Sequence, residues 1–146
     1  MWYSTNMKTI ICYTDGAARG NPGLAAAAAY ITDDNGVMVS ETAEVIGNSV
    51  TPFAEYHAVL LGLQTLLQEF GAETKTMEFE LRLVNTMVKA QVNAEQPITE
   101  PGLVPMFIEI HNLRVAHFPQ LKLQLVTPDE NTEANRLVHE ALDGRQ

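Results

Sequence analysis

Cysteine is almost absent from this sequence: Cys12 is its one example among 146 residues. A single cysteine excludes an internal disulfide and is typical of proteins from a reducing compartment. The sequence also lacks an apolar run long enough to cross a bilayer, and it lacks the basic and apolar regions of a signal peptide. We therefore expect a cytoplasmic protein with no membrane association, in which Cys12 is a small buried hydrophobe.

Basic residues are also scarce, with 9 lysines and arginines against 18 aspartates and glutamates, for a formal charge of −9. No cluster of lysine and arginine occurs anywhere along the chain. Nucleic-acid binders usually present a basic face, because phosphate neutralisation dominates their affinity, so this charge counts against tight nucleic-acid binding. Hydrophobic residues make up 46% of the chain, which is enough for one globular domain over residues 1–146.

The most informative stretch is Ile10–Gly23, where an apolar segment meets an acid and then a group of turn residues. Its β-forming residues predict a short strand over Ile10–Thr14, and the Gly, Asn and Pro that follow predict a turn. Asp15 then lies where a buried strand reaches the surface, a common position for a catalytic or metal-binding carboxylate. The alternative is an acid that merely begins a turn, and spacing alone favours that alternative.

Strands and helices follow one another along the rest of the chain. Turn residues and periodicity predict strands over Ala25–Thr32, Val37–Glu44, Met77–Leu83 and Leu121–Val126. Helices are predicted over Thr51–Phe70, Asn85–Asn93, Leu103–Val115 and Asn131–Leu142. The alanines of the second strand favour a helix by local propensity, but the turn residues on both sides of them favour a strand.

The ends of the first helix carry recognisable signals. Thr51 is expected to be its N-cap, with Pro52 at the first helical position and Gly71 as the C-cap. Residues 1–7 are expected to form a tail or a lead-in to the first strand. Three strands, a helix, and then helices mixed with strands predict a mixed α/β sheet with helices on its faces.

Two motifs resemble those of type 1 ribonucleases H. Thr14–Gly23 (TDGAARGNPG) is similar to the family's opening motif, and Ala54–Ala58 (AEYHA) is similar to its second motif, which carries a glutamate early in the first helix. The ending Asn131–Leu137 (NTEANRL) also follows the family. The resemblance implies a five-stranded mixed sheet, with an antiparallel meander of strands 1–3, parallel strands 4 and 5, and helices on both faces. It also implies hydrolysis of the RNA strand of RNA–DNA hybrids by two divalent metals, Mg²⁺ or Mn²⁺, held by three aspartates and a glutamate.

Only two of the four family carboxylates have a counterpart here. By resemblance, Asp15 and Glu55 take catalytic and metal-binding positions, and alone they imply at most one weak metal site. The third position falls on Val84 in an ungapped register, or on Asn85 after a slip of one residue, and the fourth falls on Asn135. Because valine offers no ligand and asparagine carries no charge, paired metal binding should be much weaker, with no cofactor as the limiting case.

The resemblance also assigns weak substrate contacts to four residues: Gly16, Arg19, Asn21 and Thr51. Two family features are missing around them. The polar run that precedes the family's glutamate is Val50-Thr51-Pro52 here, and the loop before the last helix, Thr127–Glu130, has no basic residue. Catalytic groups, substrate contacts and charge therefore depart from the family together.

Three hypotheses about function follow. The first, which the lost carboxylates and the charge favour, is a catalytically inactive or severely weakened ribonuclease H-like domain that acts by binding a protein partner or a second copy. The second is an active metal-dependent ribonuclease H with an atypical site. The third is a non-hydrolytic module that binds nucleic acid, for which the family substrate, an RNA–DNA hybrid, is the first candidate.

Overall fold

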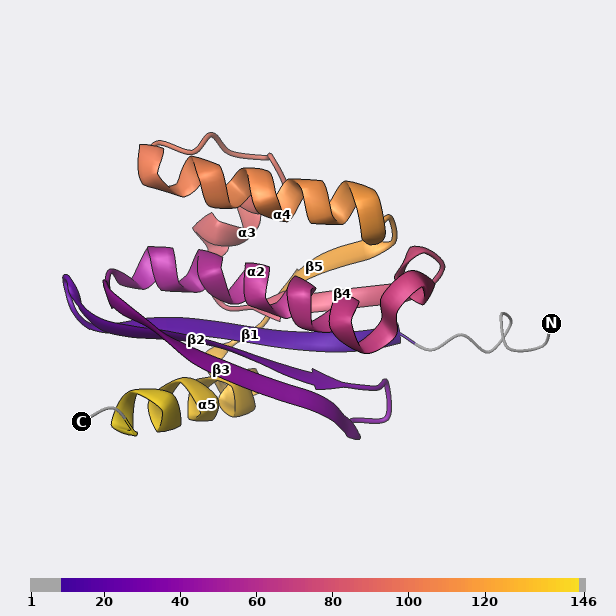
Figure 1. The fold of residues 1–146 in the computed structure, drawn as a ribbon, viewed down its shortest axis with the longest axis horizontal. Coiled ribbons are helices and arrows are strands. Elements are labelled where there is room, and N and C mark those ends of the chain that lie inside the picture. Colours follow the sequence, from indigo (N-terminus) through magenta and orange to yellow (C-terminus); the bar gives the residue numbers. More distant parts are fainter. Residues whose placement is uncertain (1–8, 145–146) are drawn as a thin grey trace.

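The computed structural model describes residues 9–144, so the lead-in expected at residues 1–7 lies outside the described residues. A single five-stranded sheet, with strand order β3-β2-β1-β4-β5, forms the centre of the fold (Figure 1). The strands are β1 (Thr9–Gly20), β2 (Gly23–Thr32), β3 (Met38–Ser49), β4 (Glu78–Leu83) and β5 (Leu121–Leu125). β1, β2 and β3 form an antiparallel meander, and β4 and β5 add in parallel, which confirms the predicted fold class.

Helices cover both faces of the sheet. The α-helices are α2 (Thr51–Phe70), α3 (Thr86–Val92), α4 (Val104–His117) and α5 (Thr132–Asp143). Short 3₁₀ helices occur at η1 (Gly71–Lys75), η2 (Pro101–Leu103) and η3 (Pro128–Glu130). α2, α3 and α4 lie on one side of the sheet, and α5 lies alone on the other (Figure 1). No helix within residues 9–144 has both the length and the apolar character needed to cross a membrane.

β1 is much longer than the predicted Ile10–Thr14, because it continues past Asp15 to Gly20. The glycines and alanines of this extension are weak strand formers, but they pair residue by residue with the start of β2, from Gly16 opposite Ala27 to Gly20 opposite Gly23. The turn shrinks to two residues. The prediction of a strand that ends in an acid is therefore wrong, and Asp15 lies inside β1.

The alanine run of β2 forms a strand, as predicted, and Ala25–Ala29 are fully buried. Successive side chains of a strand point to opposite faces, and the packing follows that rule. Ala27 packs with Ala58 of α2 on one face, whereas Ala26 and Ala28 pack with a cluster on α5 that includes Val138. Small side chains let both helices approach the sheet closely.

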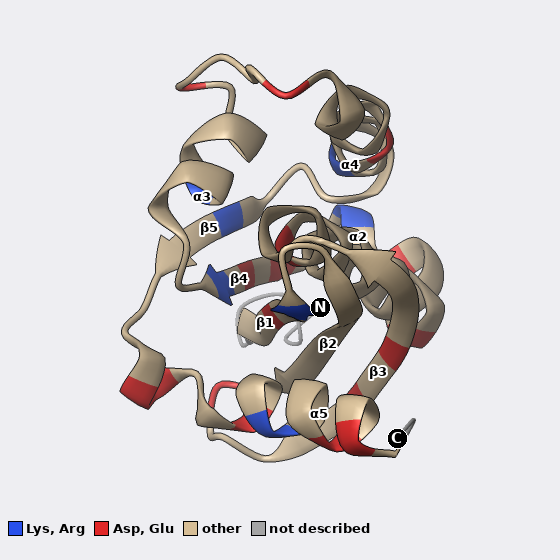
Figure 2. Cartoon of the chain, turned by 90° about the vertical axis from the view of Figure 1, so that its left-hand side faces the viewer, with Lys and Arg blue, Asp and Glu red and all other residues tan. Residues whose placement is uncertain are grey.

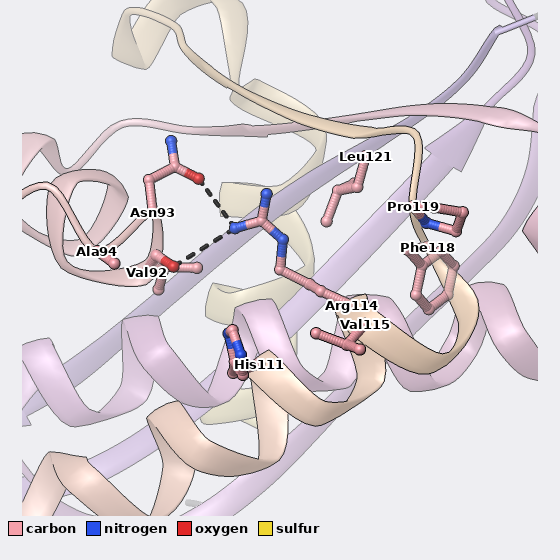
Figure 3. A pocket seen from close by; sticks show the side chains of 9 residues that line it. All are labelled: Val92, Asn93, Ala94, His111, Arg114, Val115, Phe118, Pro119 and Leu121. Carbon is pink, nitrogen blue, oxygen red and sulfur yellow. Dashed lines mark hydrogen bonds between the residues drawn. The ribbon is translucent and has the colours of Figure 1, made fainter.

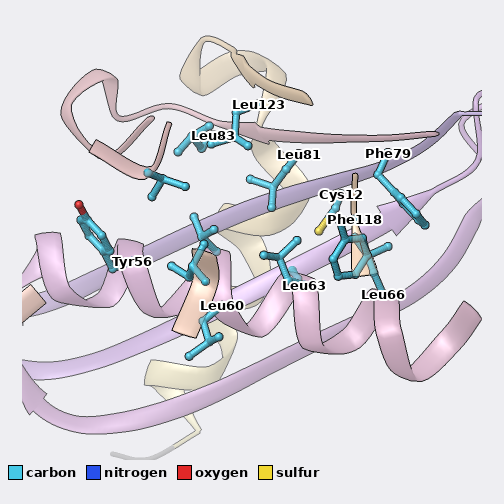
Figure 4. Close-up of a cluster of buried hydrophobic side chains, with 14 of the residues drawn as sticks. Cys12, Tyr56, Leu60, Leu63, Leu66, Phe79, Leu81, Leu83, Phe118 and Leu123 are labelled. Carbon is cyan, nitrogen blue, oxygen red and sulfur yellow. The ribbon is translucent and has the colours of Figure 1, made fainter. Parts of the chain in front are cut away.

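The main core lies between the sheet and the helices α2 and α4 (Figure 4). Leu63 and Leu66 of α2 belong to the same cluster as Phe79 of β4, whose ring packs edge-on against Phe118 with 5.2 Å between centroids. Cys12 is fully buried in the same cluster, as expected, and burial raises the pKa of its thiol to about 12.

The ends of α2 differ from the prediction in one respect. Val50, not Thr51, is the N-cap, and no side chain caps the helix. Thr51 instead lies in the first turn, and its hydroxyl accepts a hydrogen bond of 3.1 Å from the backbone N–H of Ala18 in β1. Gly71 is the C-cap, with φ of 58°, as predicted. A contact with β1 therefore replaces the expected local cap.

Candidate active site

Asp15 and Glu55 come together because β1 and the first turns of α2 are in direct backbone contact. A side-chain Cβ on Gly16 would lie 2.3 Å from both the carbonyl carbon and the oxygen of Ala54. Only glycine allows this approach. Asp15 and Glu55, each next in sequence to one of these contact residues, both line a cleft of about 380 Å³.

The residues that follow β4 add an apolar side chain to the cleft. Val84, which follows β4, lines the cleft beside the two carboxylates. Asn85 has a different role: its Oδ1 accepts a hydrogen bond of 3.0 Å from the backbone N–H of Val88 and so caps α3. Its Nδ2 donates a hydrogen bond of 2.7 Å to Oε1 of Glu55. Of the two residues left open for this position, Val84 lies in the cleft lining, and Asn85 holds Glu55 from the side.

Asparagines from the start of α5 close the other side. Asn135 donates from Nδ2 to Oδ2 of Asp15, at 3.0 Å. Asn131 is buried, with 2% of its surface exposed, and its Nδ2 donates to the carbonyl of Thr14 at 2.9 Å. Its Oδ1 is buried without a hydrogen-bond partner among residues 9–144. Sequence reasoning did not select Asn131; its spacing of four from Asn135, which puts both on one helical face, was the available signal.

Both carboxylates are held in an environment that disfavours their charge. Burial raises the pKa of Glu55 to about 7, the hydrogen bond from Asn85 acts against this, and the charge of Asp15 adds to it. Burial also raises the pKa of Asp15, against the lowering effects of Asn135, the N–H of Gly16 and the charge of His139. A cation bound between the two carboxylates would lower both pKa values instead.

The donor set does not fit two divalent metal ions. Hard cations of this kind take several charged oxygen ligands, but the cleft supplies two carboxylates, and each already accepts a hydrogen bond from an asparagine amide. Val84 offers no ligand atom. Groups of three or more His, Cys, Asp or Glu side chains able to hold a metal are absent from the described part of the chain.

The one arginine in the lining of the cleft is engaged by acids. Arg136 donates to Glu133 at 3.0 Å and to Glu140 at 3.1 Å, and it also lies near Glu41. Asp129 and Glu130 add acidic side chains in the segment just before α5. Acidic positions are frequent on α5 and on the segment before it, whereas lysine and arginine are dispersed over several elements (Figure 2). The arginine in the lining of the cleft is therefore flanked by acidic side chains.

The four residues to which the sequence assigned substrate contacts do not line this cleft. Arg19 pairs with Asp143 at 2.6 Å, and Asn21 lies in the turn between β1 and β2. Gly16 is buried against α2, and Thr51 is bonded to Ala18. Gly16 and Thr51 thus make structural contacts between β1 and α2.

Comparison with known proteins places this geometry in a family. The family described as reverse transcriptase-like matches residues 13–141. One similar structure is that of LC11 ribonuclease H1, an enzyme isolated from compost by a metagenomic approach. Its sequence is 34% identical to this one, and the two structures superimpose with a TM-score of 0.90 over 95% of this chain and 99% of that chain. The chain belongs to the ribonuclease H-like family. The structure of ribonuclease H1 from the archaeon Halobacterium salinarum is 29% identical, with a TM-score of 0.84 over 93% of this chain and 98% of that chain.

Curated members of the family extend beyond the region that this chain matches. The bifunctional protein Rv2228c of Mycobacterium tuberculosis is 27% identical over 138 residues, which are 94% of this chain and 36% of that protein. Ribonuclease HI of Halobacterium salinarum is 30% identical over 131 residues, which are 90% of this chain and 63% of that protein. The chain therefore spans between about a third and two thirds of these relatives. LC11 ribonuclease H1 has also been solved in complex with an RNA/DNA hybrid.

Proposed function

We propose that this ribonuclease H-like domain has lost, or nearly lost, hydrolysis of RNA–DNA hybrids and acts by binding, with a protein partner or a second copy as its ligand. One observation carries the proposal: the two surviving carboxylates face Val84 and Asn135 where the family resemblance expects aspartates. Two-metal hydrolysis depends on ions that clamp the attacking and the leaving oxygen, and this cleft lacks the charge to hold them.

Charge supports a protein ligand over a nucleic acid. The formal charge of the chain is −9, and Arg136 at the cleft is engaged by carboxylates. A phosphate strand would meet these acids at close range, and affinity for nucleic acid depends on cations that neutralise phosphates. A hybrid-bound relative is known, but we expect this chain to bind a hybrid weakly and with strong dependence on salt.

The alternative is an active ribonuclease H with an atypical site, in which Asp15 and Glu55 hold a single Mg²⁺ or Mn²⁺. Their shared position in one cleft supports this alternative. It requires metal-dependent cleavage that disappears when Asp15 is replaced.

Cleavage of a labelled RNA–DNA hybrid in Mg²⁺, and then in Mn²⁺, tests the proposal. We expect no cleavage by the natural chain and measurable cleavage by the double variant Val84→Asp/Asn135→Asp, which restores both carboxylates. Adding Asp15→Asn to that double variant should abolish its activity. Cleavage by the natural chain that Asp15→Asn removes would instead establish the atypical enzyme. Two further measurements on the same samples identify the kind of ligand. Binding of the hybrid at low salt would indicate a nucleic acid, and a molecular mass in solution above that of one chain would indicate a second copy.

A further inference from the structure

A second cavity, of about 380 Å³, lies at the other end of α3 (Figure 3). It is bordered by the C-terminal end of α3, the second half of α4 and the segment that leads into β5. Its lining is mainly apolar, and its three polar side chains are Asn93, His111 and Arg114. The other lining residues are Val92, Ala94, Val115, Phe118, Pro119 and Leu121. This volume is in the lower part of the range that small-molecule sites occupy, about 300–1,000 Å³.

Arg114 differs from the other arginines within residues 9–144. Arg19, Arg82 and Arg136 each pair with a carboxylate. Arg114 is partly buried, burial lowers the pKa of its guanidinium, and none of the carboxylates in residues 9–144 lies within ion-pair distance of it. Its guanidinium is therefore available to pair with an anionic ligand in this cavity.

The guanidinium is fixed by one of its nitrogens only. Nη1 donates to Oδ1 of Asn93 at 2.9 Å and to the carbonyl of Val92 at 3.4 Å, which holds the group against the end of α3. Nε and Nη2 have no acceptor among the residues that the structure describes. These two nitrogens form one edge of the fork, the geometry that binds two oxygens of a carboxylate side by side. In Figure 3, Leu121 and Pro119 lie on the side of Arg114 opposite Asn93.

We propose that this cavity, defined by Arg114 and the apolar side chains around it, binds a carboxylate carried on an apolar body. The exposed edge of Arg114 receives the two carboxylate oxygens, and Val115, Pro119 and Leu121 contact the body of the ligand. A guanidinium edge can bind either a carboxylate or a phosphate side by side, but the lining offers one arginine among mainly apolar side chains, which suits the single charge of a carboxylate better than the higher charge of a phosphate. The proposal is independent of the loss of nuclease activity, because it concerns different residues.

Binding is tested with 3-phenylpropionate as the probe, followed through the Nε–H signal of Arg114 and the backbone amide signals around it in ¹⁵N-labelled protein. We expect a dissociation constant of the order of 1 mM, the range of a small ligand with one ionic anchor. Acetate has the carboxylate without the apolar body, and inorganic phosphate has a different anion. Both should bind at least tenfold more weakly than the probe.

Variants separate recognition from structural support. Arg114→Lys keeps the charge but lacks the fork, and Arg114→Gln lacks both, so each should weaken binding at least tenfold. Because Arg114 also supports α3, a second pair of variants leaves it in place. Val115→Glu adds a carboxylate in the cavity lining and should weaken binding, whereas Ile108→Glu makes the same change on an exposed part of α4 outside the lining and should not.

Three results would overturn the proposal. The first is no shift of the Arg114 signals at about 20 mM probe, far above the expected dissociation constant. The second is equal binding of phosphate and 3-phenylpropionate. The third is unchanged affinity in Arg114→Lys or in Val115→Glu, because either variant removes what the proposed ligand recognises.

Discussion

Asn135 donates a hydrogen bond from its side-chain amide to the carboxylate of Asp15, across 120 residues of sequence, at 3.0 Å. Asn85 donates in the same way to Glu55, at 2.7 Å. Each surviving acid of the cleft is thus held by the amide of an asparagine. These two bonds fix the positions of both carboxylates through side chains of the chain itself.

Asn135→Asp should therefore destabilise the metal-free protein. The change removes a donor to Asp15 and places a second negative charge beside it, so we expect a loss of about 1–2 kcal/mol in the free energy of unfolding. Added Mn²⁺ should restore part of that loss, because the variant has three acids around the cleft. Urea unfolding in EDTA and in Mn²⁺ measures both effects. Asn135→Ala is the control and should show a loss without a metal response; an equal response in both variants would contradict this account.

Glu55 should make the metal-free protein less stable as the pH rises. Its pKa is about 7 in the folded protein against 4.5 as the ordinary value, so between these values the folded state holds a proton that the unfolded state has released. The contribution of Glu55 to the free energy of unfolding is therefore greatest below about pH 4.5, and it is lost as the pH rises to about 7. Because Glu55 is partly exposed, we expect only about 1–2 kcal/mol. The measurement is the free energy of unfolding between pH 4.5 and pH 7 in EDTA, for the natural chain and for Glu55→Gln. The natural chain should lose stability over this range relative to Glu55→Gln, and the same pH dependence in both proteins would contradict the prediction.

Gly16→Ala should be among the most damaging single changes in the chain. The new methyl group would occupy the position 2.3 Å from the backbone of Ala54, so β1 and α2 would have to move apart. We expect a loss of about 3 kcal/mol in the free energy of unfolding. Gly102→Ala is the matched control, since nothing lies within 4 Å of the added carbon. Thermal unfolding of the two variants distinguishes them, and similar stabilities would show that the contact between β1 and α2 is loose.

Cys12 should be inert in the folded protein. It is fully buried, and burial raises the pKa of its thiol to about 12; the thiolate is the reactive form. We expect no labelling by an aromatic disulfide reagent at pH 8 in native conditions and complete labelling in denaturant. Rapid labelling of the native protein would show that the core around β1 opens readily.

Most of the fold was predictable, because helix periodicity, turn residues and two local motifs indicate it directly. The length of β1 was not: Gly16 and its small neighbours have little strand propensity, and only their pairing with β2 makes them extended. The role of Thr51 was missed for a similar reason. Local rules favour it as a helix cap, but its hydroxyl bonds to Ala18, which is 33 residues away.

The candidate site was predictable only in part. Asp15 and Glu55 belong to motifs that can be recognised in the sequence, and the structure brings them into one cleft. The sequence left Val84 and Asn85 as alternatives; Val84 lines the cleft, and Asn85 donates a hydrogen bond to Glu55. The asparagine bonds and the exposed edge of Arg114 depend on contacts between distant segments, which no local pattern reports.

The buried alanines of β2 also bear on the width of the cleft. Glu55 of α2 and Asn135 of α5 reach the cleft from opposite faces of the sheet, and the buried alanines of β2 pack against both helices, Ala27 against α2 and Ala26 and Ala28 against α5. Larger side chains there would push the helices outward and widen the cleft. Substitutions at Val84 or Asn135 leave that spacing untouched. The close spacing of α2 and α5 across the sheet thus depends on the alanines of β2, whereas Val84 and Asn135 are not among the residues of these packing clusters.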